Sequence, residues 1–199
     1  PGTTWPLPLY ELALSFRRRA DQRGRGGLAI TLHTPEEAPL FVFGGAASEA
    51  IGELFAARRI RISTGTSPEP ERMPPTGPVV ALPLIDGPML EGLPQDDGGF
   101  IPIDHHARVR GVDRVYAAGD GANFPIKQGG LGTQQADAAA EHIASHLGSD
   151  RAPQPFAPVL RGILFTAGGS LHLRGEVGGG EGEASLDRLW WPPDNIEGK

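Results

Sequence analysis

Apolar positions in the first part of the chain recur first with helical spacing and then in a short continuous run. Over residues 5–19 apolar side chains recur three or four positions apart behind Pro6 and Pro8, which predicts an amphipathic helix that begins near these prolines. The glycine-rich residues 24–27 end the helix. The apolar residues 28–33 then predict a buried strand, so the order resembles most of a βαβ unit.

The next segments continue this alternation of helix and strand. Residues 48–58 predict a helix with Ser48 as its N-cap, and residues 60–62 alternate like a short strand. Residues 64–78, rich in Pro, Glu, Ser and Thr, predict a loop or short hairpin between two domains. Residues 79–83 are apolar and predict a strand that opens the second domain.

The pattern with most chemical content lies further along the chain. Residues 115–118 predict a buried parallel strand that ends in Gly119-Asp120, and the glycine-rich residues 127–133 precede an Ala-rich helix predicted over residues 134–147. Open α/β sheets hold ligands at the carboxyl ends of their strands, and a helix start carries unpaired N–H donors. We therefore expect an anionic or electron-rich ligand near Asp120.

Composition narrows the classes of function. The formal charge of −6 and the pI of about 5.5 argue against general nucleic-acid binding, and the absence of cysteine excludes a disulfide or thiolate redox centre in this segment. No run of about eighteen apolar residues is present, so we expect a soluble, cytoplasmic protein. His105 and His106 lack ligand spacing and would point apart on a strand, so no metal is expected.

The strand, the Gly-Asp pair and the glycine-opened helix together resemble the second flavin motif of the FAD-dependent pyridine nucleotide-disulfide oxidoreductase superfamily. The matching text is GVDRVYAAGD followed by NFPIKQGGLGTQQADAAAEHIA. Within that superfamily the chain is most similar to the branch with type II NADH dehydrogenases and sulfide:quinone oxidoreductases. The resemblance implies an α/β fold that combines a partial Rossmann-like NAD(P)-binding domain with the C-terminal half of an FAD-binding domain, in three layers around a mostly parallel sheet.

The resemblance also implies which residues hold the cofactor. Asp120 would accept a hydrogen bond from an FAD hydroxyl, and amides at the start of the Ala-rich helix would face the flavin, where Lys127 is either a further contact or a plain surface lysine. The implied FAD-binding residues are Gly119, Asp120, Lys127, Gln128, Gly129, Gly130, Leu131 and Thr133. No residue is nominated as a general acid or base, and no metal ligand is expected.

The same resemblance divides the chain into three parts. Residues 1–77 would be an NAD(P)-binding-like domain without its first strand, residues 78–149 the C-terminal half of the FAD-binding domain, and residues 150–199 a segment that covers the flavin or forms an interface. Because the chain starts at Pro1 and its first residues look like the exit of a strand, we expect it to be a C-terminal part of something longer.

In the first domain the match to a nucleotide-binding site is partial. Glu11 matches the acidic residue of the first helix, and Glu36 or Glu37 could accept hydrogen bonds from an adenosine ribose, although helix capping or solvation of these glutamates is equally plausible. Where the family often has Gly-x-Gly-x-x-Gly, this chain has Pro and Trp; proline lacks the N–H that would hold a pyrophosphate.

Two functions from different classes are consistent with the sequence. The first is an FAD-dependent oxidoreductase that passes electrons from NAD(P)H through flavin to a second small-molecule acceptor. The alternative is a non-catalytic α/β interaction module that keeps the fold without a working cofactor site. Trp190 and Trp191 either pack within the carboxyl-terminal part or a homodimer interface, or contact a quinone or a membrane surface.

Overall fold

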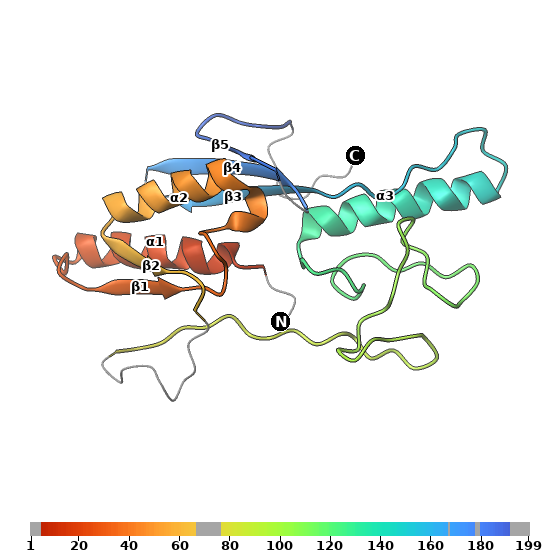
Figure 1. Ribbon diagram of the computed structural model, residues 1–199, viewed down its shortest axis with the longest axis horizontal. Helices are drawn as coiled ribbons and strands as arrows, with labels where there is room; N and C mark the ends of the chain where they lie inside the picture. Colours follow the sequence, from red (N-terminus) through yellow and green to blue (C-terminus); the bar gives the residue numbers. More distant parts are fainter. Residues whose placement is uncertain (1–4, 67–76, 167, 178–179, 192–199) are drawn as a thin grey trace. The chain divides into compact units, whose positions relative to one another are not determined.

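The computed structural model describes residues 5–66, 77–166, 168–177 and 180–191. It divides into two compact units, Pro6–Leu82 with Leu160–Pro193 (the sheet unit) and Pro83–Val159 (the α3 unit) (Figure 1). The three-part division into FAD and NAD(P) domains remains a prediction.

Helices and strands alternate through the first part of the sheet unit. In order they are α1 (Leu7–Gln22), β1 (Ile30–His33), the 3-10 helix η1 (Phe41–Phe43), α2 (Gly45–Ala57) and β2 (Ile60–Ser63). β1 and β2 pair in parallel, with Ile30 opposite Ile60. Because parallel neighbours need a crossover connection, β1, α2 and β2 form the βαβ arrangement typical of nucleotide-binding folds.

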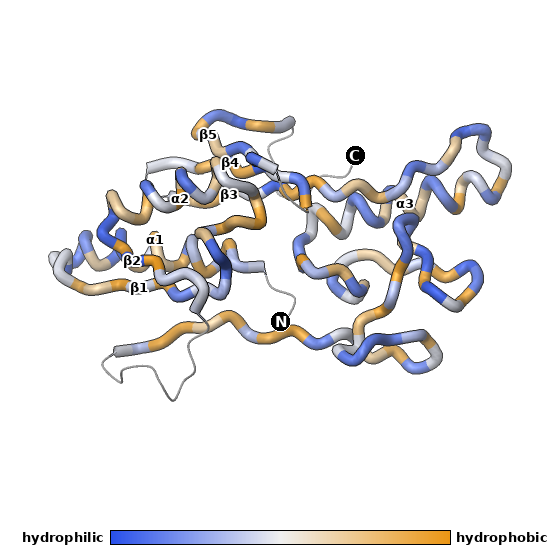
Figure 2. The backbone as a smooth tube through the Cα atoms, viewed as in Figure 1, coloured by the Kyte–Doolittle hydropathy of each residue, from blue (hydrophilic) through white to orange (hydrophobic). Residues whose placement is uncertain are grey.

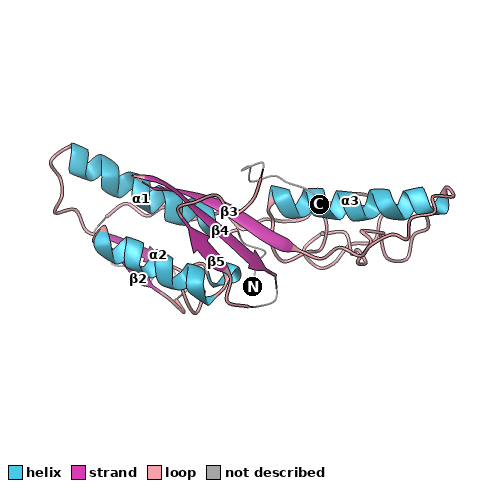
Figure 3. Ribbon diagram, turned by 90° about the horizontal axis from the view of Figure 1, so that it is seen from above, coloured by secondary structure: helices cyan, strands magenta, loops and turns pink. Residues whose placement is uncertain are grey.

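A second sheet completes the same unit. Strands β3 (Val159–Thr166), β4 (Gly169–Glu176) and β5 (Glu183–Ser185) lie in the order β3-β4-β5, and β4 and β5 are antiparallel. Helix α2 contacts β2 on one side and β5 on the other, so it lies between the two sheets (Figure 3). Tyr10, Phe43 and Phe55 are fully buried in the core.

Helix α1 packs as the apolar pattern predicts, with one polar exception. Leu7, Tyr10, Ala13 and Leu14 are on its buried face, and so is Arg17, only 2% exposed. The Arg17 guanidinium donates to the carbonyl oxygens of Leu28 and Arg25 and pairs with Asp21. The buried arginine therefore holds the turn between α1 and β1.

The α3 unit consists of one long helix and extended segments without named strands. Helix α3 (Gly129–His146) presents the buried residues Leu131, Ala138 and Ala139 to the loops that precede it. Those loops are joined by isolated bridges, of which Ile101 to Ala122 is parallel and Arg108 to Tyr116 antiparallel.

The α/β class is confirmed, but two predicted strands are wrong. Residues 115–118 are half-buried or exposed and form only the antiparallel bridge at Tyr116, because their backbone hydrogen bonds go to residues 107–109. Residues 79–83 are exposed and form no strand, although they are apolar (Figure 2). Both segments have strand-like composition, but a strand also needs a neighbour to pair with, and the described residues provide none in parallel.

Two helix starts also differ from the prediction. Ser48 is not the cap of α2: the helix begins at Gly45 behind Gly44, whose φ of 99° favours glycine, and the Ser48 hydroxyl donates to the carbonyl oxygen of Pro39. Helix α3 starts five residues earlier than predicted, so its glycines form the first helical turn rather than a loop. The predicted loop at residues 64–78 lies mostly outside the described residues.

None of the described helices is long and apolar enough to cross a membrane.

Gly175 lies against backbone, which gives a test of the packing in the sheet unit. A Cβ at this position would lie 2.6 Å from the carbonyl oxygen of Phe43, whereas a Cβ at Gly52 in α2 would meet nothing within 4 Å. We expect Gly175→Ala to lower the free energy of unfolding by about 1–3 kcal/mol through overpacking. Gly52→Ala, the same change in open space, should raise it by about 0.5–1 kcal/mol. Urea unfolding of both variants measures the two effects, and equal losses would contradict this packing.

Candidate functional site

A close approach of two glycines organises the predicted cofactor segment. A Cβ at Gly132 would lie 3.0 Å from the Cα of Gly119, so the first turn of α3 lies against the turn that carries Asp120. Gly119 has a φ of 81°, a conformation that favours glycine, and its N–H donates to Oε1 of Gln135 at 2.7 Å. The α3 unit therefore brings the Gly-Asp turn and the helix start together.

Two buried glutamines of α3 hold neighbouring segments to the helix, Gln135 the Gly119 turn and Gln134 the chain at Val159, and neither was predicted to have a role. Gln134 and Gln135 are 4% and 1% exposed. The Gln134 amide donates to the carbonyl oxygen of Val159 at 2.9 Å and accepts from the Val159 N–H at 3.0 Å, in place of a strand neighbour. Adjacent glutamines within an Ala-rich helix are the sequence signal, since buried amides need hydrogen-bond partners.

The start of α3 uses some of its amides internally. Gln128 is the N-cap, and its side-chain Oε1 accepts from the N–H of Leu131 at 2.9 Å. Thr133 donates to the carbonyl oxygen of Gly130 at 2.8 Å. The N–H groups of Gly129 and Gly130 belong to the first turn, where a helix has no internal acceptor for them, and Gly129 is exposed.

Asp120 and Lys127 differ sharply in burial. Asp120 is exposed on the turn, whereas Lys127 is only 5% exposed. The Lys127 ammonium donates to the carbonyl oxygen of Ala122 and lies 3.8 Å from the ring centroid of Phe100. Burial lowers the pKa of Lys127, and the carboxylates of Asp120 and Asp96 oppose that shift. Lys127 is therefore not a plain surface lysine.

Glu36 follows β1 in the sequence, and its carboxylate accepts hydrogen bonds from residues of the same unit. Its Oε2 accepts from the Tyr10 hydroxyl at 2.9 Å and from the Thr34 hydroxyl at 2.8 Å. Burial raises the pKa of Glu36, although the hydrogen bonds from Thr34 and Tyr10 oppose this shift. The Leu40 N–H donates to the Tyr10 oxygen at 3.3 Å, so the cluster ties α1 to the segment before η1.

Glu11, on α1, is half-buried, and burial raises its pKa. Glu37 is exposed. All three glutamates belong to the sheet unit, whereas residues 119–133 belong to the α3 unit.

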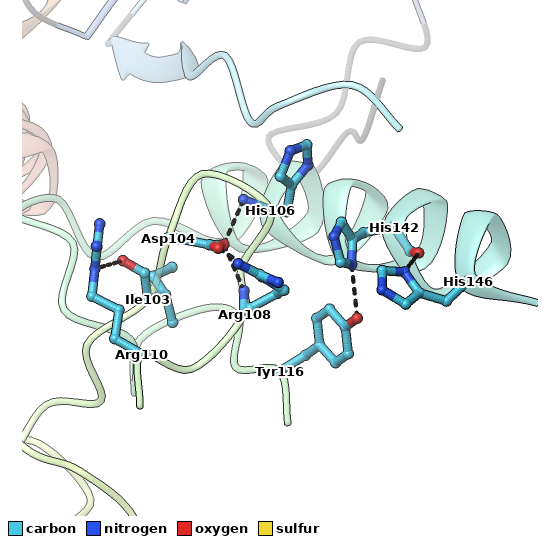
Figure 4. Close-up of polar contacts among 8 residues, drawn as sticks. All are labelled: Ile103, Asp104, His106, Arg108, Arg110, Tyr116, His142 and His146. Atoms are coloured by element: carbon cyan, nitrogen blue, oxygen red, sulfur yellow. Dashed lines mark hydrogen bonds and ion pairs between the residues drawn. The ribbon is translucent and has the colours of Figure 1, made fainter. Parts of the chain in front are cut away.

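A cluster of histidines lies along the second half of α3 (Figure 4). His105 and His106 occupy a turn rather than a strand, and their ring centroids are 4.7 Å apart, which corrects the expectation that they point apart. The ring centroids of His106 and His142 are 5.0 Å apart, and those of His142 and His146 are 4.4 Å apart. Among the residues described, no group of three or more His, Cys, Asp or Glu could hold a metal ion.

The two tryptophans near the carboxyl end have different surroundings. Trp190 is half-buried and packs edge-on against His172, with ring centroids 5.2 Å apart. Trp191 is 73% exposed, and the Arg188 guanidinium lies 5.5 Å from its ring centroid. Only Trp191 is available for an outside contact of any size.

Known structures of similar fold include two enzymes and a larger assembly. The sulfide:quinone oxidoreductase of Aquifex aeolicus matches with a TM-score of 0.71 and 16% sequence identity, over 94% of this chain and 52% of that one. LpdA of Mycobacterium tuberculosis matches with a TM-score of 0.54 and 18% identity, over 84% of this chain and 38% of that one. The chain thus spans about half the length of the oxidoreductase, or less for LpdA.

A third match is the mitochondrial ATP synthase of Tetrahymena thermophila, with a TM-score of 0.56 and 18% identity over 83% of this chain and 46% of that one. No protein-family model and no curated protein matches the sequence. At these identities the likeness establishes the fold.

The Tyr10–Glu36 contact can be tested by two nearly isosteric changes. We expect Tyr10→Phe to lower the free energy of unfolding by about 1–3 kcal/mol, since a buried acceptor and the Leu40 N–H lose a partner. Glu36→Gln keeps an acceptor oxygen and removes a buried charge, so it should cost less at pH 7.

The pH dependence of the same pair has a defined sign. A carboxyl whose pKa is raised by folding holds its proton more tightly in the native state. The stability that Glu36 contributes is therefore complete below its unfolded pKa and is lost as the pH rises through the folded value. Urea unfolding at pH 4 and pH 7 measures this effect. Between these two pH values the free energy of unfolding of the wild type should fall by more than that of Glu36→Gln, and equal losses would argue against a buried carboxyl.

Proposed function

We propose that this chain is the FAD-contacting part of an oxidoreductase that takes electrons from NAD(P)H and passes them to a second acceptor, with a quinone as the leading candidate. The observation that carries the proposal is the contact between the Gly119–Asp120 turn and the first turn of α3. This contact brings the turn with the exposed Asp120 against the first turn of α3, where Gly129 is exposed and Gly130 is buried.

The residues of the turn and the helix start are suited to FAD. The Asp120 carboxylate would accept a hydrogen bond from a hydroxyl of the ribityl chain or near the phosphates. The Gly129 and Gly130 amides would donate to the electron-rich edge of the flavin ring, and their fixed dipoles need no reorganisation when negative charge develops there. A bound flavin supplies the electron transfer itself.

Lys127 supports this site from beneath the turn. Its ammonium is held on the Ala122 carbonyl oxygen and over Phe100. From that position its charge favours an anionic ligand near Asp120 through the electrostatic field, and it also fixes the loop that connects the turn to α3. The proposal therefore gives direct contact to the amides and a supporting role to Lys127.

The βαβ order of the sheet unit supports the NAD(P)H half of the proposal. In this proposal Glu36 would accept hydrogen bonds from an adenosine ribose, and Glu11 would match the acidic residue of the first helix. A ribose hydroxyl would compete for Glu36 with Tyr10 and Thr34, which already donate to its carboxylate. Pro6 and Pro8 also remove two N–H groups from the start of α1. Nucleotide binding by this unit is accordingly proposed to be weak.

The proposal of a quinone as the electron acceptor rests on an exposed aromatic side chain near the carboxyl end of the described residues. Trp191 exposes a large amphipathic ring, which suits contact with a quinone or a membrane surface. Packing of the same ring at a homodimer interface is the competing proposal. The oxidoreductase of similar fold carries a quinone in its name.

Because Asp120 is exposed, its role in FAD binding can be tested by substitution in the full-length protein. We expect Asp120→Ala to weaken FAD binding by about 10- to 100-fold, the loss of one hydrogen bond to a charged group. The FAD affinity of Asp120→Asn, which keeps an acceptor oxygen, should lie between those of the wild type and Asp120→Ala. Asp150→Ala, at another exposed aspartate, should bind FAD like the wild type.

The measurement is FAD binding followed by absorbance at about 450 nm, then bleaching by NADH or NADPH. Bound flavin that either nucleotide bleaches supports the enzyme. A wild-type protein that stays colourless after incubation with FAD would favour the alternative, a non-catalytic interaction module. Full flavin retention by Asp120→Ala would remove Asp120 from the site.

A further inference from the structure

The histidines of the α3 unit form a continuous stack rather than isolated side chains (Figure 4). Three successive ring contacts join His105, His106, His142 and His146, with centroid separations of 4.7, 5.0 and 4.4 Å. Two of these residues come from the 104–116 segment and two from α3. The stack is therefore a contact between a loop and the helix on which it lies.

His142 is the centre of the stack. It is 8% exposed, and its Nδ1 lies 2.8 Å from the Tyr116 hydroxyl. His146 Nδ1 donates to the carbonyl oxygen of His142 at 3.0 Å, which fixes the outer ring of the pair. The Nδ1 atom of His106 is buried without a hydrogen-bond partner. The burial of His142 favours its neutral ring.

The charged groups around His142 would do little to stabilise a positive charge on its ring. Arg108 and Asp104 face the stack from the loop, and they are paired with each other at 2.8 Å. Although burial alone would raise it, hydrogen bonds from Arg108 and the His106 N–H lower the pKa of Asp104 to about 2, so its charge is already engaged. His106 and Tyr116 from the loop and His146 from α3 bring no other negative charge at neutral pH.

We propose that this imidazole stack is an acid-sensitive latch: protonation of His142, at its centre, separates the 104–116 segment from the second half of α3. A positive His142 ring would be buried beside the Arg108 guanidinium, with the Asp104 carboxylate already paired to Arg108. The 2.8 Å contact of His142 Nδ1 with the Tyr116 hydroxyl does not offset this cost, because the hydroxyl can donate to the neutral ring as well as accept from the charged one. The segment leads directly into residues 117–120. Opening of the latch would therefore loosen the turn that carries Asp120.

The direction of the pH effect follows from the folded state of His142. Burial, followed by the neighbouring His146 and His106, lowers the pKa of His142. The unfolded chain then binds more protons than the native chain between the folded value and the unfolded value of about 6.5. The contribution of His142 to stability is complete above pH 6.5 and falls as the pH drops toward the folded pKa.

Thermal unfolding of wild type and His142→Asn at several values between pH 7.5 and pH 5 tests the latch. Asparagine can still form a hydrogen bond with Tyr116 but does not titrate, so comparison of the two pH slopes cancels the other ionisable groups. The wild type should lose about 3–5 °C more than His142→Asn for each unit of pKa depression. His33→Asn, on β1 in the other unit, should keep the wild-type slope. Equal slopes for wild type and His142→Asn would overturn the proposal.

Two further measurements localise the effect and do not depend on recovery of the variant. An NMR titration of the histidine Cε1 protons in the wild type should place the pKa of His142 below about 6.5. Hydrogen exchange, corrected for intrinsic rates, should show faster opening of residues 104–117 at pH 5 than at pH 7.5, with β1 and β2 unchanged. A value at or above 6.5, or uniform exchange, would also overturn it. All readouts use protein without FAD, so they are independent of the proposed function.

Discussion

The candidate site depends on the close approach of two backbones at a pair of glycines. A Cβ at Gly132, in the first turn of α3, would lie 3.0 Å from the Cα of Gly119, so a side chain at position 132 would require the helix start or the Gly-Asp turn to shift. The hydrogen bond from the Gly119 N–H to Gln135 then holds the turn in register with the second turn of the helix. This contact sets the position of the Asp120 turn against the start of α3, and the bridge between Ile101 and Ala122 holds the residues that follow the turn.

Periodicity was sufficient for α1, β1 and β2 because these elements pack against neighbours that are close in the sequence. The apolar spacing of α1 and the short apolar runs of β1 and β2 each find their partners within the same unit, so local pattern and tertiary packing agree. The start of α2 was wrong because Ser48 is a good cap in isolation, but Gly44 allows the chain to turn into a helix earlier.

Pattern failed where structure depends on a distant partner. Residues 79–83 and 115–118 have the composition of strands, yet strand formation is decided by a neighbouring backbone rather than by the segment itself. The hydrogen bonds of Gln134 and Gln135 were not predicted for a related reason. Their partners lie outside α3, so the sequence of the helix does not identify them. His106 and His142 are far apart in sequence, so their stacking has no local signature either.

The exposed run at residues 79–90 has a consequence for how this polypeptide behaves in a test tube. It leaves seven large side chains in water: Val79, Val80, Leu82, Leu84, Ile85, Met89 and Leu90. An exposed apolar segment of this length favours association with chromatography resins, with chaperones and with other copies of the protein. This attraction is short-ranged, whereas the electrostatic repulsion between copies is screened by salt. Colloidal behaviour will therefore be governed by a dozen residues that contribute nothing to the interior of either unit, and low ionic strength is the condition that favours dispersed molecules.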